Sequence, residues 1–383
     1  MVAAPRPLDL DRAATTPLHP DVAAAMAPWW GAEGANAAAV HGGGRAARRA
    51  VEDARERVAD AVGARHDEVV FTSGATEADQ LALLGVAGER AGGHVVVARS
   101  EHPAVVRAGE RLEARGHPVT WLSPAADGRI DPDAVAGALR PDTVLVAAMR
   151  VNNETGALND VAAIAEAARE RGAWVLCDAV QALGYERLRR EDLGADLLVL
   201  SAHKAGGPQG IGALVVRTGV PLASQAWGGS QERGRRAGTT PVALAVGFGA
   251  AAARAADGPE ARAQRVAAVR DRFEAAVLRI AGVAPSLPPG TPRGPKHAHV
   301  VVAALGGDGE TLLMNLDAEG VWASLGSACA AGSLEPSPVL VAMGWTPARA
   351  RSAVRFSFGE DHTLADADEA AQRFARALER TLG

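Results

Sequence analysis

Between residues 68 and 217, short runs rich in valine, leucine and isoleucine alternate with longer segments of helical periodicity. The short runs are apolar throughout, which is typical of strands that are covered on both faces of a sheet. This order favours an α/β fold with a largely parallel sheet and helices on both sides. We predict strands at Glu68–Thr72, His94–Ala98, Thr143–Ala148, Ala173–Asp178, Leu197–Ser201 and Ile211–Val216, and helices near Thr76–Arg90, Pro103–Arg115 and Asp160–Arg171.

The composition and the periodicity of the sequence change after about Ala253. A charged helix is expected at Glu260–Ala281, a connector rich in proline and glycine at Pro285–Pro295, and then a second series of strands and helices. A chain of 383 residues is long enough for two domains. We therefore place a domain boundary near residue 253.

Charge and hydropathy exclude several classes of protein. The net charge is -5, and no run of like charge stands out beyond short arginine-rich turns such as Arg233–Arg236. The sequence therefore shows no basic patch of the kind that binds nucleic acids. The longest uncharged stretch, Ala237–Ala253, is shorter than the roughly 20 apolar residues of a membrane span. The first residues lack the apolar core of a secretion signal, and Cys177 and Cys329 do not suggest a disulfide framework. We expect a soluble, cytoplasmic protein without a metal site.

Polar residues cluster where five predicted strands end. Ligands bind beyond the carboxyl ends of the strands in such sheets, so five polar segments at one crevice indicate a site. These segments are Ser73–Glu77, Ser100–His102, Asn152–Glu154, Asp178–Gln181 and Ser201–Lys204.

Lysine occurs only at Lys204 and Lys296, so 40 basic residues minus 2 leaves 38 arginines. Arginine replaces lysine where a point charge suffices, but it cannot supply a deprotonatable amine. Lys204 follows a predicted strand, whereas Lys296 ends a turn rich in proline and glycine. We therefore predict that Lys204 is the lysine with a chemical role.

Three further features are ambiguous when each is taken alone. The backbone at Gly74–Thr76 suits a phosphate or forms an ordinary helix N-cap. Asp178 is either half of a structural ion pair or a carboxylate that faces a bound cation, and His102 is either an ordinary histidine or a site residue. Together with Lys204 they form the set that pyridoxal phosphate needs, namely a lysine, a carboxylate, a flat side chain and a phosphate cup.

At these and other motifs the sequence resembles the cysteine desulfurases, which are pyridoxal-phosphate enzymes of fold type I in the class-V aminotransferase group. The motifs run in order from about Leu8 to Ala375. They are Asp11–Pro17, Phe71–Glu77, Glu101–His102, Val151–Gly156, Asp178–Gln181, Ser201–Lys204, Arg236–Thr239, Gly326–Cys329 and Val354–Ser357. The resemblance implies a large domain of residues 15–255 with a mainly parallel seven-stranded sheet, and a smaller α+β domain of residues 1–14 and 256–383.

The resemblance also implies a role for each matching residue. Lys204 would bind the cofactor covalently and move protons, and Asp178 would keep the ring nitrogen protonated. His102 would stack on the ring and relay protons, as a third catalytic residue beside Lys204 and Cys329. Gln181 would donate to the ring oxygen, while Asn153 and Arg355 would hold the substrate carboxylate. The phosphate would be held by Ala75, Thr76, Ser201 and His203, with Thr239 from the neighbouring subunit of a homodimer whose active sites lie at the interface.

Cys329 indicates the reaction type. It lies in a segment of small residues that is neither helical nor strand-like, as expected of a mobile loop. By the resemblance, its thiolate would take sulfur from L-cysteine, leave L-alanine and pass the sulfur to an acceptor protein. The product pathway would be iron-sulfur cluster assembly, tRNA thiolation or another thiolated compound. Cys177 lies in an apolar strand, where a packing role is the better interpretation.

Two other interpretations remain at this stage. One is selenocysteine lysis or another class-V reaction on the same fold, and the other is a degenerate binding partner without activity. Cys329 argues against plain transamination, and Lys204 argues against a degenerate protein. The sequence departs from the family pattern at Ala37–Ala39, where Pro-Ser-Ser is usual, and at Ala237 and Leu325, where serine is common. We also expect it to lack the long C-terminal extension of some family members.

Overall fold

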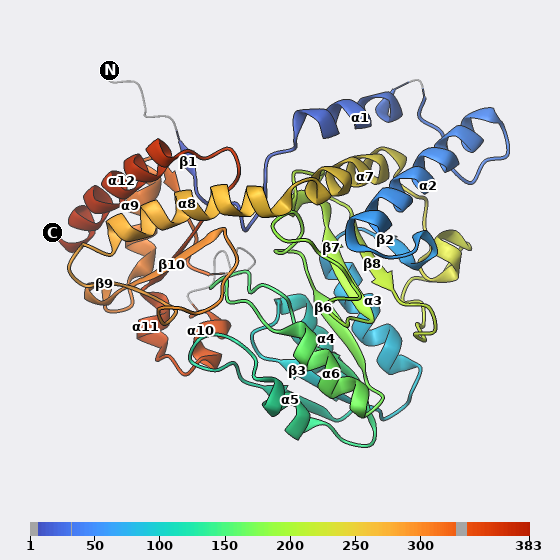
Figure 1. Cartoon of the computed structure of the whole chain (residues 1–383), viewed down its shortest axis with the longest axis horizontal. Helices are drawn as coiled ribbons and strands as arrows, with labels where there is room; N and C mark the ends of the chain where they lie inside the picture. The colour runs from blue at the N-terminus through green and yellow to red at the C-terminus, as the bar shows by residue number, and fades with distance from the viewer. Residues whose placement is uncertain (1–6, 32, 327–334) are drawn as a thin grey trace.

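The computed structural model describes residues 7–31, 33–326 and 335–383 (Figure 1). Its centre is a seven-stranded sheet with the order β2-β8-β7-β6-β5-β3-β4. The strands from β3 to β7 pair in parallel, whereas β8 runs antiparallel to both of its neighbours, so the predicted mainly parallel sheet is confirmed. The strands are β2 (Val69–Thr72), β3 (His94–Ala98), β4 (Val119–Leu122), β5 (Thr143–Ala147), β6 (Trp174–Asp178), β7 (Leu197–Ser201) and β8 (Gly212–Val216).

Helices cover both faces of this sheet, because successive side chains of a buried strand point to opposite faces and both must be shielded from water. Val96 and Val175 pack in one hydrophobic cluster with α2, α6 and α7, while Val95 and Leu176 pack in another with α3 and α4. The helices of this region are α1 (Pro20–Trp30), α2 (Gly42–Val62), α3 (Ala75–Gly88), α4 (Pro103–Glu113), α5 (Pro132–Ala138), α6 (Val161–Glu170) and α7 (Val242–Ala256), with short 3-10 turns at η1 (His66–Glu68), η2 (Ala202–Lys204) and η3 (Gln231–Gly234).

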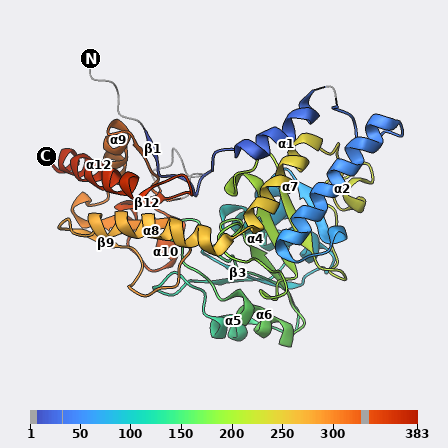
Figure 2. The same cartoon turned by 45° about the horizontal axis from the view of Figure 1, so that its top comes forward.

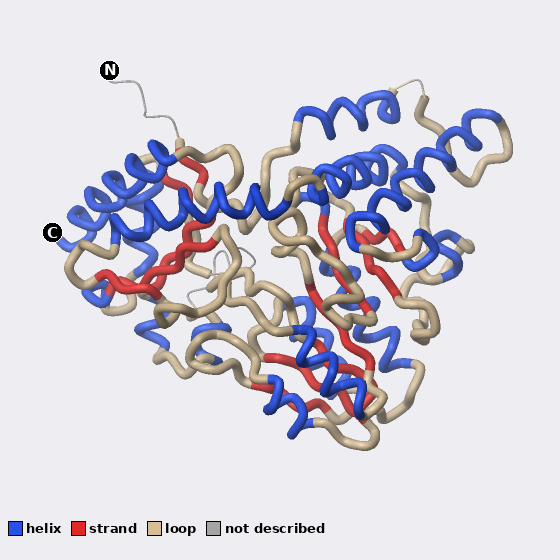
Figure 3. The backbone as a smooth tube through the Cα atoms, viewed as in Figure 1, coloured by secondary structure: helices blue, strands red, loops and turns tan. Residues whose placement is uncertain are grey.

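The remaining elements form a second group with its own hydrophobic cluster. Phe273, Phe356 and Phe374 pack against one another in this cluster. Figure 3 shows its strands well apart from the large sheet, with α8 extending between the two groups. The elements are β1 (Leu8–Asp9), α8 (Pro259–Val277), β9 (Val283–Pro285), β10 (His297–Val302), η4 (Ala303–Leu305), α9 (Gly309–Ala318), β11 (Val321–Trp322), α10 (Pro338–Ala342), α11 (Pro347–Arg351), β12 (Ala353–Ser357) and α12 (Leu364–Leu382).

Two connections tie the N-terminal segment to this second group. The strand β1 pairs in parallel with β11, and Asp11 bridges Ser357 of β12, which itself lies in the antiparallel sheet β12-β10-β9. In Figure 2, β1, α9 and α12 lie on one side of the molecule, and α1, α2 and α7 lie on the other. The described chain therefore begins, at residue 7, beside its C-terminal elements and then enters the large sheet region. No helix in the described residues has both the length and the apolarity to cross a membrane.

Candidate active site

Three predicted site residues lie at the carboxyl ends of β3, β6 and β7, at one edge of the seven-stranded sheet. His102 is the N-cap of α4, after β3, Asp178 is the last residue of β6, and Lys204 lies in η2, after β7. Both His102 and Lys204 act electrostatically on the Asp178 carboxylate, so the three side chains share one local environment. The structure thus brings them together where ligands bind in such sheets.

The N-terminal segment holds the lysine turn. The Lys204 Nζ donates to the backbone oxygens of Ala13 and Ala14 at 2.5 and 2.6 Å. The Thr16 hydroxyl donates to the His203 carbonyl at 2.8 Å and accepts from the Gly206 N–H at 2.9 Å. These contacts explain the Asp11–Pro17 motif, because this segment fixes the position of the lysine on the sheet edge.

Asp178 belongs to a cluster of three buried carboxyl groups, with Asp79 and Glu101. Burial raises the pKa of Asp178, and the nearby His102 and Lys204 act in the opposite direction. Burial also raises the pKa of Glu101, to about 8. Burial also raises the pKa of Asp79, and neither of its carboxylate oxygens has a hydrogen-bond partner among the described residues. The Asp178 Oδ1 accepts from the Val180 N–H at 2.9 Å. Such a cluster favours a cation beside Asp178.

The hydrogen bonding of His102 fixes its tautomer. Its Nδ1 accepts from the Ala104 N–H at 3.2 Å, so the proton of the neutral ring resides on Nε2. Burial lowers the pKa of His102, while Asp178 acts in the opposite direction. A neutral, mostly buried imidazole is suited to stacking on a flat ligand.

The start of α3 forms a cradle for an anion. Gly74 is its N-cap and no side chain caps the helix, so the first amides of α3 are available next to Thr76. The strand β8 passes close by, because a Cβ on Gly212 would lie 2.9 Å from the Ala75 nitrogen. Ser201 ends β7 and is buried. The pKa of His203 is lowered to about 4, mainly by burial and further by the positive charges of Lys204 and Lys296.

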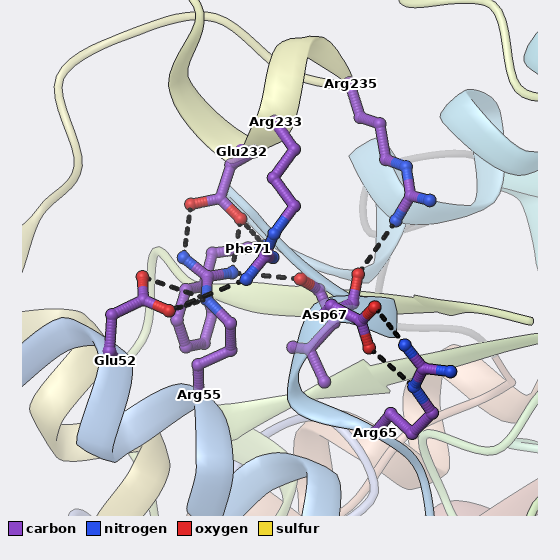
Figure 4. Close-up of polar contacts among 9 residues, drawn as sticks. Glu52, Arg55, Arg65, Asp67, Phe71, Glu232, Arg233 and Arg235 are labelled. Carbon is purple, nitrogen blue, oxygen red and sulfur yellow. Dashed lines mark hydrogen bonds and ion pairs between the residues drawn. The ribbon is translucent and has the colours of Figure 1, made fainter. Parts of the chain in front are cut away.

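The loop that leads to Thr239 is anchored by a buried ion pair (Figure 4). Arg55 of α2 donates to both carboxylate oxygens of Glu232 at 2.5 and 3.0 Å, and the Phe71 N–H donates to Glu232 at 2.9 Å. Glu232 and Arg233 have φ angles of 49° and 57°, in the left-handed region that is costly for such residues. The contacts of Glu232 with Arg55 and Phe71 hold this strained segment in place. The sequence shows only an arginine-rich turn here, and it carries no signal for the pairing of Glu232 with Arg55 across 177 positions.

Thr239 itself is exposed at the end of this loop. Arg236 ties the loop to α3, because its guanidinium donates to the two Glu77 oxygens at 2.8 and 3.2 Å. The Gly238 N–H donates to the Gln231 side chain at 3.2 Å. The loop is thus held at several points while Thr239 faces outward.

The predicted carboxylate-binding residues are in contact. Arg355 of β12 is buried, and its guanidinium donates to the backbone oxygen of Asn153 at 2.9 Å and to Asp11 at 2.6 Å. The Arg355 Nε has no partner among the described residues. Arg355 comes from the small-sheet region and Asn153 from the large-sheet region, so the site lies where the two regions meet.

Cys329 lies outside the described residues. The residues on either side of that segment are tied to the site: Ser324 exchanges backbone hydrogen bonds with Arg355, and the Ser337 hydroxyl donates to the Glu154 carboxylate. Cys177 is fully buried in β6, and burial raises the pKa of its thiol. This placement is consistent with packing.

Lys296 is the residue that sequence reasoning most underestimated. It is 1% exposed and lies beside Lys204, with its Nζ 3.4 Å from the Lys204 backbone oxygen. A turn rich in proline and glycine is typical of an exposed segment, so the sequence did not indicate that Lys296 is buried. A cavity of about 390 Å³ borders Lys204 and Tyr185, close to Lys296.

The sheet order and the lysine, aspartate and histidine at its carboxyl edge define a fold type I α/β enzyme. A family model described as Aminotransferase class-V matches residues 9–369. The cysteine desulfurase IscS of Anaeromyxobacter dehalogenans is 43% identical to this chain over 382 residues, which cover 98% of this chain and 93% of that relative. The chain belongs to the class-V aminotransferase family and, within it, to the cysteine desulfurases, whose members are pyridoxal-phosphate enzymes.

Solved structures agree with this assignment. A NifS-like protein superposes with a TM-score of 0.91 at 28% identity, covering 98% of this chain and 100% of that one. A structure of SspA in complex with cysteine gives a TM-score of 0.81 at 34% identity, covering 92% of this chain and 99% of that one.

Proposed function

We propose that this cysteine desulfurase converts L-cysteine to L-alanine, forms a persulfide on Cys329 and passes the sulfur to an acceptor protein. In this proposal it acts as a cytoplasmic homodimer, and Thr239 of each copy contributes to the phosphate site of the other. The observation that carries the proposal is the Lys204 amine, which two backbone oxygens hold at the carboxyl edge close to Asp178 and His102. The sequence relatives support the reaction type.

We further propose the domain division stated above, with residues 15–255 as the large domain and residues 1–14 and 256–383 as the small one. The separate hydrophobic clusters support this division. The pairing of β1 with β11 supports the assignment of the N-terminal residues to the small domain. The substrate site then lies between the domains, beside Asn153 and Arg355.

The residues present fit pyridoxal phosphate. The buried Asp178 carboxylate suits a protonated ring nitrogen, the uncapped start of α3 with Thr76 suits the phosphate, and the Lys204 amine suits a covalent bond. Ser201, His203 and Ala75 would complete the phosphate site. When bound, the cofactor supplies an electron sink for bonds at the substrate carbon that carries the amino group.

The side chains of this chain then have separate tasks. Lys204 would accept and return protons at the substrate carbon, and Asp178 would keep the ring nitrogen protonated. His102 would lie against the ring, and Gln181 would donate to the ring oxygen. Arg355 would offer its planar fork to the substrate carboxylate, with Asn153 beside it, and such a fork recognises carboxylates better than a point charge does.

Cys329 would perform the sulfur transfer. Its thiolate attacks the substrate sulfur, a sulfur–sulfur bond forms, and the bond between that sulfur and the substrate carbon breaks. The carbon gains a proton and leaves as L-alanine. One L-cysteine and one enzyme thiol thus become one L-alanine and one enzyme persulfide, with no added oxidant.

The presence of only two lysines gives a direct test. We expect borohydride reduction of the protein loaded with pyridoxal phosphate to fix the cofactor on the peptide that contains Lys204, as read by mass spectrometry. Lys204→Arg should lose the visible absorbance of the bound cofactor, because a guanidinium does not form the covalent bond. Lys296→Met is the matched control and should still be labelled at Lys204. A cofactor fixed on Lys296 would contradict the proposal.

A further inference from the structure

The two lysines of the chain, 92 positions apart, meet at the active site. Lys296 precedes β10, and its backbone oxygen accepts from the Phe358 N–H at 3.0 Å, which fixes the turn beside the end of β12. Its side chain is among the largest fully buried ones of the protein. Elsewhere this chain uses arginine for a positive charge, so an amine at this buried position calls for a specific explanation.

The surroundings of Lys296 are polar but contain no ionic partner. Its Nζ donates to the Gln181 Oε1 and to the Lys204 backbone oxygen, each at 3.4 Å, and lies 4.5 Å from the centre of the Tyr185 ring. Within the part of the chain that the structure describes, no carboxylate forms an ion pair with it. A buried amine held only by neutral acceptors and a ring costs stability, so a merely structural role is a poor explanation.

These contacts fix the orientation of the Gln181 amide. The Oε1 faces the Lys296 amine, and the Nε2 donates to the Ala13 oxygen at 3.0 Å. If the Gln181 amide were flipped, its N–H would face the protonated Lys296 amine and its oxygen would face the Ala13 oxygen. Only one orientation is therefore favourable. The same Ala13 oxygen accepts from the Lys204 Nζ at 2.5 Å. The Gln181 N–H group therefore lies next to the amine that would carry the cofactor.

We propose that Lys296 is a positioning residue that orients the Gln181 amide so that its N–H donates to the ring oxygen of the cofactor. The proposal rests on the proposed function, because it needs Gln181 to contact that oxygen. It adds a residue that acts through Gln181 and does not touch the substrate.

The charge state of Lys296 supports this role. Burial, followed by the effect of Lys204, lowers the pKa of Lys296 to about 7. The titratable groups around it are Lys204, His203, Tyr185 and His297. Burial lowers the pKa of both histidines and raises that of Tyr185, so these three stay neutral near pH 7. The protonated amine has no lone pair and can only donate, so Lys296 orients Gln181 most strongly below about pH 7.

A double-mutant cycle tests whether Lys296 acts through Gln181. The measured quantity is the dissociation constant of pyridoxal phosphate, followed by visible absorbance, for wild type, Lys296→Met, Gln181→Ala and the double variant. We expect Lys296→Met to weaken binding by about tenfold, the value of one hydrogen bond, and the double variant to bind no more weakly than Gln181→Ala alone. Lys296→Gln keeps a donor and should recover most of the loss. Arg279→Met removes an exposed cation and should bind as wild type does.

A second measurement does not depend on the folding of a Lys296 variant. Lysine labelled with ¹³C at its ε-carbon gives two side-chain NMR signals in this chain, and the Lys296 signal is the one that remains in Lys204→Arg. We expect this signal to titrate near pH 7 and, in wild type, to shift when pyridoxal phosphate is added, with the shift lost in Gln181→Ala.

Additive losses in the cycle, or a Lys296 signal unaffected by the cofactor, would overturn the positioning role and leave the proposed function intact. A wild-type protein that takes up no pyridoxal phosphate would instead contradict the proposed function itself.

Discussion

The Arg55–Glu232 anchor and the active site bury charged groups in opposite ways. In the anchor, guanidinium and carboxylate meet at 2.5 and 3.0 Å, and the pair lies between α2 and the loop that leads to Thr239 (Figure 4). In the active site, Glu101 accepts from a backbone N–H, and Lys296 contacts an amide oxygen and an aromatic ring. The carboxylate oxygens of Asp79 have no hydrogen-bond partner among the described residues. The anchor is therefore a direct ion pair, whereas these three active-site groups have no ion-pair partner among the described residues.

The pKa shifts follow this difference. Burial alone would lower the pKa of Arg55, but the contacts with Glu232 outweigh burial and raise it, so the charge is retained. Burial raises the pKa of Glu101 to about 8 and lowers that of Lys296 to about 7, so both groups move toward neutrality. We infer that buried groups without a charged partner, which titrate near neutral pH, mark the part of the protein that handles protons and a charged cofactor.

The largest expected effect on stability is in the anchor. Glu232→Gln leaves the Arg55 charge buried without its counter-ion, so we expect the free energy of unfolding to fall by about 3–5 kcal/mol in urea denaturation. The matched control is Glu52→Gln, which removes a half-exposed partner of Arg55 at 3.3 Å and should cost less than about 0.5 kcal/mol. If both variants lowered the free energy of unfolding by the same amount, the buried Arg55–Glu232 pair would not be the anchor that we describe.

A smaller effect with a defined pH dependence is expected in the active site. Because burial raises the pKa of Glu101 from 4.5 to about 8, the folded state holds a proton that the unfolded state has lost between these values. The stability that this carboxyl group contributes is complete below pH 4.5 and is lost as the pH rises through 8. Its Oε1 accepts from the Met149 N–H at 2.6 Å, a bond that glutamine can retain.

We therefore expect the free energy of unfolding of wild type to fall by about 2–3 kcal/mol relative to that of Glu101→Gln as the pH rises from about 5 to about 8. This is less than the full pKa shift would give, because the surroundings of a buried charge relax. Parallel stability curves for the two proteins over this range would show that Glu101 is ionised and paired, like the anchor residues.

Much of the sheet could be predicted because burial leaves a direct signature in the sequence. The strands β3 and β7 have the predicted bounds, and the other predicted strands differ by one residue at an end. The direction of β8 could not be predicted, because an apolar run reports burial on both faces and not strand direction. The edge strand β4 was missed, because its residues are only half-buried and lack a continuous apolar run.

The candidate site was predictable to a different extent. Residues that follow strands, such as Asp178 and Lys204, could be grouped because the carboxyl ends of parallel strands share an edge. The role of Lys296 could not be predicted, because its burial depends on the approach of its turn to Gln181 and Tyr185, which are more than 100 residues away. The same holds for Glu232, which pairs with Arg55 across 177 positions.

The central claim is that the protein makes L-alanine from L-cysteine through Cys329. The most direct measurement is the L-alanine formed by purified wild type, Cys329→Ser and Cys177→Ala, each loaded with pyridoxal phosphate, in the presence of a thiol reductant. We predict alanine from wild type and from Cys177→Ala, and none above background from Cys329→Ser, although that variant keeps the visible absorbance of the cofactor. Alanine formed by Cys329→Ser at the wild-type rate, or no alanine from wild type that holds its cofactor, would contradict the account.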